Sequence, residues 1–246
     1  MNENFDAFDK YVMNYDMDEK MINYKYNHSY RVVHQAEEIC RSLEMDTIER
    51  DLASNIALLH DIARFRQWTD YKTFKDSESF DHGDEGVKIL FDEGEIKNFI
   101  IDKDDYEVVK KAVAGHNKYD LDYSDMTDRE ALQCKIVRDA DKIDIIIETS
   151  NSVKNPNVRI DEHVINNFKN HELVANEAGD TDFLYVIREI AFFFDINYKR
   201  SMEILLEHDL LNKKLNLIRS DINKDQVDLI EKELKKYIKE RFDIEC

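Results

Sequence analysis

Four of the eight histidines fall on predicted apolar helix faces, where a ring nitrogen needs a polar partner. His60 continues the apolar stripe of residues 53–57 and is followed directly by Asp61. The other three inward histidines are His28, His82 and His116. His82 shares its face with Gly86, and a glycine there predicts room for a bulky neighbour such as a metal site.

A carboxylate completes this set late in the predicted helix Asp128–Glu148. Asp141 continues the stripe of Cys134 and Val137, whereas Asp139 falls on the polar side with Lys135 and Lys142. An unpaired carboxylate in a helical core costs several kcal/mol, so a cation is its expected partner. Four inward histidines and two carboxylates offer the nitrogen and oxygen ligands that suit Mn, Fe, Co, Ni or Zn.

Helices position these side chains, because apolar residues recur at three- and four-residue spacing almost throughout the chain. The pattern predicts helices over Glu3–Tyr15, Asp18–Leu43, Thr47–Ala63, His82–Glu93, Asp104–His116, Asp128–Glu148, Asp161–Asn170, Asp182–Leu206 and Lys224–Phe242. Arg66–Phe80 breaks the period and is predicted to be an ordered loop. The fold class is therefore all-α. Thr149–Arg159 carries the only proline and is the predicted boundary between a front core and a back extension.

Composition narrows the classes of partner. With 246 residues, the chain can bury a large core, and its 5 glycines and 1 proline are too few for the turns of a many-stranded sheet. A formal charge of −19 repels polyanions, which argues against nucleic acid polymers and anionic membranes. No apolar run approaches the about 20 residues that span a bilayer, and the three widely spaced cysteines predict reduced thiols in a cytoplasmic protein.

The spacing of these residues resembles the H…HD…D signature of the HD-domain metal-dependent phosphohydrolases. The resemblance covers residues 24–147. It rests on three segments of this chain, which are His28-Ser-Tyr-Arg31-Val, Leu58-Leu-His60-Asp61-Ile-Ala63-Arg64-Phe and Ala140-Asp141-Lys142. Members usually have glycine where this chain has Ala63, a departure that touches no ligand. The resemblance implies a single helical HD-domain core over residues 1–150, followed by a helical extension over residues 151–246. Because this extension has strong apolar faces, such as Ala191–Phe194, we expect it to pack on the core.

The resemblance also implies the ligands. His28, His60, Asp61 and Asp141 would bind a first metal, and Asp61 would bridge to a second. His82 and His116 match the additional histidines of the dinuclear H…HD…H…H…D subset. The implied cofactors are one or two divalent ions, drawn from Mn, Fe, Co, Ni, Zn and Mg. The implied reaction is hydrolysis of a small phosphorylated substrate, a nucleotide or related phosphoester or anhydride, by a metal-bound hydroxide.

Four further residues have weaker assignments. Arg31 and Arg64 lie one turn after His28 and His60, where each could hold a substrate phosphate or form a salt bridge to a ligand carboxylate. Lys118 is a further candidate for phosphate binding. Asp144 could orient a ligand histidine or contact the substrate.

Two alternatives remain open at this stage. The same ligand set resembles that of diiron oxygenases, which need bound iron and consume O2. A catalytically silent protein would bind metal and ligand without turnover. The ligands do not distinguish these classes, and a homodimer is also left open.

Overall fold

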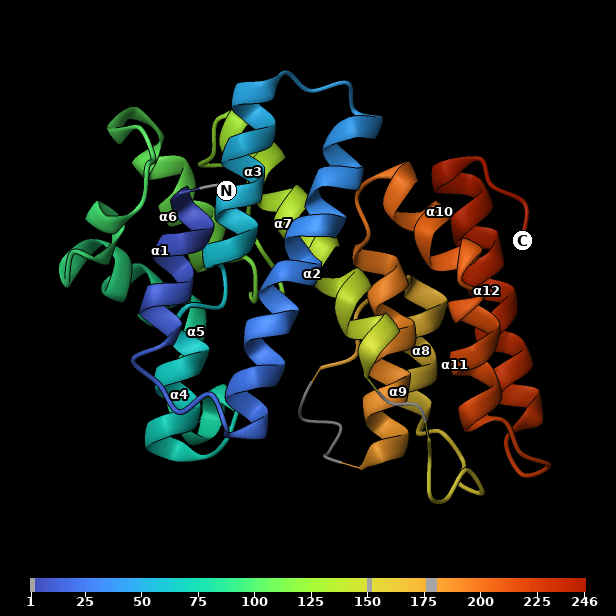
Figure 1. Cartoon of the computed structure of the whole chain (residues 1–246). Helices are drawn as coiled ribbons and strands as arrows, with labels where there is room; N and C mark the ends of the chain where they lie inside the picture. Colours follow the sequence, from blue (N-terminus) through green and yellow to red (C-terminus); the bar gives the residue numbers. More distant parts are fainter. Residues whose placement is uncertain (1–2, 150–151, 176–180) are drawn as a thin grey trace. The chain divides into compact units, whose positions relative to one another are not determined.

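Helices joined by turns make up the computed structural model, which describes residues 3–149, 152–175 and 181–246 (Figure 1). These residues contain no strand, which confirms the all-α class. The chain divides into two compact units, Met1–Asp141 and Lys142–Cys246, and the boundary falls within helix α7. Among the described helices, none is both long enough and apolar enough to span a bilayer.

The first unit holds the predicted site. Its α-helices are α1 (Glu3–Val12), α2 (Lys20–Ser42), α3 (Thr47–Leu59), α4 (Ala63–Tyr71), α5 (His82–Val87), α6 (Tyr106–Gly115) and the greater part of α7 (Asp128–Glu148). A π-helical turn, η2 (Lys88–Asp92), continues α5, and three short 3-10 turns are η1 (Asp76–Glu78), η3 (Glu95–Asn98) and η4 (Lys103–Asp105). The bounds of α2, α6 and α7 agree with the predicted ranges to within a few residues.

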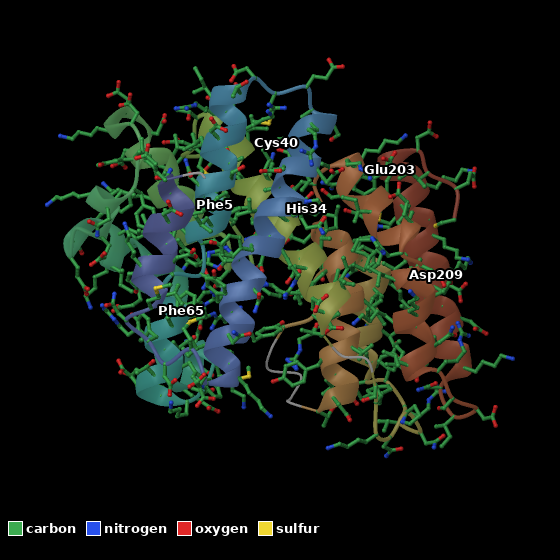
Figure 2. All side chains as sticks on the ribbon, viewed as in Figure 1. Phe5, His34, Cys40, Phe65, Glu203 and Asp209 are labelled. Carbon is green, nitrogen blue, oxygen red and sulfur yellow. The ribbon has the colours of Figure 1, made fainter. Side chains whose placement is uncertain are left out.

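Helices α2 and α3 pack along each other in the first unit (Figure 1). Their facing sides bury apolar residues at helical spacing, among them Val32, Ile39, Leu52, Ile56 and Leu59. Cys40, near the end of α2, is buried in the same core (Figure 2). His28 lies on the buried side of α2, so it is held toward α3.

The predicted helix Thr47–Ala63 ends earlier, at Leu59. His60 and Asp61 form the turn that follows, and the amide of Arg64 donates to the Asp61 carbonyl at 2.9 Å. Helix α4 then begins at Ala63. The turn brings both side chains into the interior, where His60 is fully buried and Asp61 is 2% exposed.

The predicted loop Arg66–Phe80 is wrong in its first part, because α4 continues to Tyr71. Phe65 lies on α4 (Figure 2). It anchors this helix by edge-to-face contacts with Phe8 and Tyr11 of α1. The helical period was obscured by Gln67, which is polar but fully buried. Its amide donates to the Asp76 carboxylate, the Ser79 hydroxyl and the Phe80 carbonyl, and these bonds satisfy it in the core.

Two glycines let α5 approach α6 closely. A side chain at Gly83 would stand 2.6 Å from the Asn117 amide oxygen and 2.9 Å from the Ala114 carbonyl. A side chain at Gly86 would meet Val113 at 3.1 Å. Gly86 therefore serves the packing of one helix on another, and the predicted space for a metal site at Gly86 is wrong.

The second unit is helical as well. After the end of α7 it contains α8 (Glu162–Asn170), α9 (Asp182–Ala191), the 3-10 turn η6 (Phe192–Asp195), α10 (Lys199–Glu207), α11 (Leu210–Ile218) and α12 (Lys224–Phe242). The range of α12 is as predicted.

The single predicted helix Asp182–Leu206 is wrong. It is interrupted at η6, where the Phe194 carbonyl accepts from the Tyr237 hydroxyl and Asp195 pairs with Lys142 at 2.8 Å. These tertiary bonds stabilise the 3-10 turn in a segment whose apolar content predicts a continuous α-helix. Helix α11 was not predicted.

Candidate metal centre

The six sequence-predicted ligands come together inside the first unit. They arrive from separate elements: His28 from α2, His60 and Asp61 from the turn after α3, His82 from the start of α5, His116 from the end of α6, and Asp141 from α7. The four histidines and Asp61 are at most 5% exposed. Each histidine presents its Nε2 atom to a shared interior point near Asp61.

One group of donors gathers around one oxygen of Asp61. The Nε2 atoms of His28 and His60 lie 3.3 and 3.6 Å from Asp61 Oδ2. The same nitrogens lie 3.2 and 3.7 Å from Asp141 Oδ1, and 3.3 Å from each other. Asp141 rather than Asp139 therefore faces the first two histidines, as the helical phase predicts.

A second group gathers around the other oxygen of Asp61. The Nε2 atoms of His82 and His116 both lie 3.5 Å from Asp61 Oδ1, and 3.0 Å from each other. The two oxygens of one carboxylate thus face two different pairs of imidazoles. Rings of the two groups also touch, because His60 and His116 meet edge to face with centroids 5.0 Å apart.

These spacings suit coordination of a metal ion. Donors about 2.1 Å from one ion are about 3.0 Å apart in octahedral and about 3.4 Å apart in tetrahedral geometry. The nitrogen and oxygen atoms of each group are 3.0 to 3.7 Å apart, close to these values. In addition, Asp141 Oδ1 is buried and accepts no hydrogen bond from the described residues. A cation would satisfy this oxygen.

The outer nitrogens of three histidines have protein partners. His60 Nδ1 lies 2.6 Å from the Ala57 carbonyl, and His116 Nδ1 lies 2.7 Å from the Val113 carbonyl. A carbonyl can only accept, so both Nδ1 atoms carry the proton and both Nε2 atoms keep a free electron pair. His82 Nδ1 lies 2.6 Å from the Asp76 carboxylate, which fixes the same tautomer.

Burial favours the charge states that bind metal. It lowers the pKa of His82 to about 3, with the nearby Arg64 guanidinium contributing, and it also lowers the pKa of His116. Burial alone would raise the pKa of Asp61, but the Lys25 ammonium and the imidazoles hold that pKa well below its usual range. Burial would likewise raise the pKa of Asp141, but the adjacent imidazoles of His28 and His60 hold that pKa well below its usual range. At neutral pH the centre therefore presents His82 and His116 as neutral imidazoles, and Asp61 and Asp141 as ionised carboxylates.

Arg64 lies against the centre, with its guanidinium held by protein groups. Nη1 donates to the Gln67 side chain at 2.6 Å and to the Phe74 carbonyl at 2.7 Å. It also lies 3.1 Å from Asp76, and Nε lies 3.4 Å from Asp61 Oδ1. The contact with Asp61 is the predicted salt bridge to a ligand carboxylate. Binding of a substrate phosphate by Arg64 stays a prediction.

The three remaining predicted residues have other surroundings. Arg31 stacks near Tyr24, whose ring in turn stacks on His28. Lys118 is bonded to Asp81 and Asp84, at 2.7 and 3.0 Å. Asp144 is buried one turn beyond Asp141 in the second unit. Their predicted roles in substrate binding or catalysis stay predictions.

Two charged residues of the centre were not predicted. Lys25 is buried one turn before His28, and its Nζ lies 2.5 Å from Asp61 Oδ2. The argument that oriented His28 would have found it, because residues three apart share a helix face. Asp76 lies in a 3-10 turn, where no periodic signal marks an inward side chain.

The polar side assigned to α7 is wrong. Asp139 is fully buried, and Lys142 is only 7% exposed. From Gln133 to Ala140 every residue except Lys135 is buried, so this stretch has no broad solvated face. A helix that buries most of its circumference does not follow the alternation of apolar and polar faces on which the assignment depended.

Residues 26–146 match the family model of the HD domain, a range that is close to half of the chain and includes all six donors. No curated protein and no solved structure matches the chain.

Proposed function

Because the chain belongs to the HD-domain superfamily, whose members are mostly metal-dependent hydrolases, we propose that it is a metal-dependent phosphohydrolase of small phosphorylated molecules. The observation that carries this proposal is the position of Asp61. Its two oxygens face two pairs of buried imidazoles, which is the arrangement needed for a carboxylate that bridges two ions. The predicted dinuclear centre is part of the proposal.

The residues divide between two ions. His28, His60, Asp61 and Asp141 would hold the first ion, and His82, His116 and Asp61 the second. When bound, divalent ions supply a nucleophile by lowering the pKa of a coordinated water, and they neutralise charge on a phosphoryl oxygen. The nitrogen and oxygen donors suit Mn, Fe, Co, Ni or Zn, as the sequence predicts.

The remaining charges of the centre favour an anionic substrate. Lys25 and Arg64 place an ammonium and a guanidinium on Asp61, next to the histidine pairs. Both cations also lie 5.5 Å from the centroid of the Phe74 ring. A phosphate group that entered here would meet two positive side chains, which could neutralise its non-bridging oxygens.

The size of the substrate follows from the charge of the chain. A formal charge of −19 repels a polyanion over its whole length but opposes a small phosphoester much less. We therefore retain a small phosphorylated molecule as the partner. We also propose a cytoplasmic location, because Cys40 and Cys134 are buried as free thiols.

The test begins with metal analysis of the purified protein. It continues with a screen of phosphomonoesters, phosphodiesters and nucleotides, with Mn2+, Co2+ and Ni2+ added in turn. We expect phosphate release that requires metal and stops on addition of a chelator. Oxygen consumption by an iron-loaded sample without phosphate release would replace the hydrolase by the oxygenase alternative. Bound metal without either activity would favour the silent alternative.

A variant of the bridging residue sharpens the test. Asp61→Ala should lower the rate by several orders of magnitude, because it removes a ligand from both groups. Asp51→Ala, an exposed position of α3, is the matched control and should keep the rate. Circular dichroism of both variants checks the fold. Full activity of Asp61→Ala without added metal would exclude a metallohydrolase.

A further inference from the structure

Arg138 is a buried arginine that serves the end of another helix. Its side chain is 2% exposed, and its Nη1 atom donates to the carbonyl oxygens of Gly115, His116 and Lys118 at 2.7, 3.2 and 2.8 Å. Gly115 is the last residue of α6, and His116 and Lys118 lie in the segment that follows it.

The bonds match what a helix end requires. The last carbonyls of a helix have no partner within the helix, and they carry the negative end of its dipole. A guanidinium supplies several donors and a positive charge at one point. Burial of an arginine is costly, so its cost here is offset by bonds that hold this one segment.

The segment carries two residues of the metal centre, His116 and Asn117. His116 presents its Nε2 atom 3.0 Å from that of His82 and 3.5 Å from Asp61. The amide of Asn117 donates to the carboxylates of Asp76 and Asp81, at 3.2 and 3.0 Å. A shift of this segment would therefore move the predicted ligand His116. It would also weaken the hydrogen bond from Asn117 to Asp76, the carboxylate that contacts His82.

Arg138 also connects the two halves of the centre. It precedes Asp141 by three residues in α7, so the two side chains leave neighbouring points on one face of the helix. Asp141 belongs to the group with His28 and His60, whereas Arg138 holds the segment of His116. One turn of α7 thus sets both groups relative to each other.

We propose that Arg138 is a positioning residue, which fixes His116 and Asn117 against Asp61 and thereby gives the second group its affinity for metal. The inference rests on the proposed function, because it assigns a role at the same centre. It predicts that the two groups respond unequally to changes at Arg138, since its bonds to the Gly115, His116 and Lys118 carbonyls hold the segment that carries His116 of the second group.

Two substitutions test the proposal. Arg138→Met keeps the aliphatic length and removes every donor, and Arg138→Lys keeps the charge but cannot reproduce the planar fork. Arg129→Met is the control on the same helix, because Arg129 binds the carboxylates of Glu49 and Asp105 and no carbonyl of the α6 segment. Metal affinities are measured by titration of metal-free protein with Mn2+ or Co2+ in chelator-buffered solution.

We expect Arg138→Met to weaken the second binding step by about 10- to 100-fold while the first step stays within about 3-fold. Arg138→Lys should recover part of the loss, and Arg129→Met should match the wild type in both steps. In metal-free protein, the imidazole nitrogen resonances of His116 should also shift in Arg138→Met, with those of His28 unchanged.

Three results separate the interpretations. Unchanged affinity at both steps in a folded Arg138→Met protein would reduce Arg138 to a helix cap and overturn the proposal. If Arg138→Met does not fold, the metal affinities of Arg138→Lys are compared with those of the wild type. Unchanged affinity at both binding steps would then overturn the proposal. A wild-type protein that binds two ions but hydrolyses no phosphoester would refute the proposed function and leave the role of Arg138 intact.

Discussion

The Nδ1 atom of His82 lies 2.6 Å from the Oδ2 atom of Asp76, and this contact joins the start of α5 to the 3-10 turn before it. Asp76 also contacts Arg64 through its other oxygen, at 3.1 Å. Burial alone would raise the pKa of Asp76, but the hydrogen bond from His82 Nδ1 and the charge of the Arg64 guanidinium hold that pKa below its usual value. The carboxylate is therefore ionised, and it orients the ring of His82 by contacting Nδ1, the nitrogen that does not face Asp61.

Removal of the Asp76 carboxylate should weaken metal binding by the second group. We expect Asp76→Ala to lower that affinity by about 10- to 100-fold, because His82 loses the partner that fixes its tautomer. Asp76→Asn should lose less, since its amide oxygen still accepts from Nδ1. Glu78→Ala is the control, because Glu78 lies in the same turn, is exposed, and forms its described ion pair with Lys75. Equal affinities in Asp76→Ala and Glu78→Ala would contradict the orienting role.

The double variant His82→Ala with His116→Ala should halve the bound metal. The first group keeps His28, His60, Asp61 and Asp141, so one ion per chain should remain. Elemental analysis after equilibration with a metal buffer measures the ratio. An unchanged ratio would show that the centre is mononuclear and that the two histidines serve substrate binding or packing.

The ion pair of Lys25 and Asp61 should stabilise the metal-free protein. Lys25→Met leaves the buried carboxylate without its ammonium, and we expect the free energy of unfolding to fall by about 3 kcal/mol. Combining it with Asp61→Asn should cost less than the sum of the two single changes, because neither charge is then left alone. Lys20→Met, at an exposed position of α2, should stay within about 0.5 kcal/mol of the wild type. Urea unfolding in chelator measures all four variants, and additive losses would refute the coupling.

Thiol labelling should distinguish the three cysteines. Burial raises the pKa of Cys40 to about 11 and that of Cys134 to about 12, so both stay protonated at pH 8. The thiolate is the reactive form, and we expect a maleimide to label only the exposed Cys246 in the native protein. Unfolded protein should react at all three positions. Native labelling of Cys134 as fast as Cys246 would contradict this.

The sequence predicted the parts of the centre that lie on regular helices. His28 and Asp141 continue apolar stripes in α2 and α7, so their inward direction followed from the helical period alone. The range of α7 was also predicted, since its apolar residues repeat over the whole segment.

The parts that were missed depend on tertiary contacts. Gln67 is polar and buried, so its position in α4 resembles a break in the pattern. Asp76 comes from a short turn that is fixed by bonds to Gln67 and His82 rather than by local periodicity. Lys25 shares a face with His28, and only its charge made it resemble a surface residue.

The single carboxylate of Asp61 has a thermodynamic consequence for metal titration. Its two oxygens serve two groups, so a cation on one side withdraws charge from the carboxylate that the other side uses. By linkage, each ion must change the affinity of the other by the same factor. The two binding steps should therefore deviate from the isotherm of independent sites, and the size of this deviation measures how strongly the shared ligand couples them.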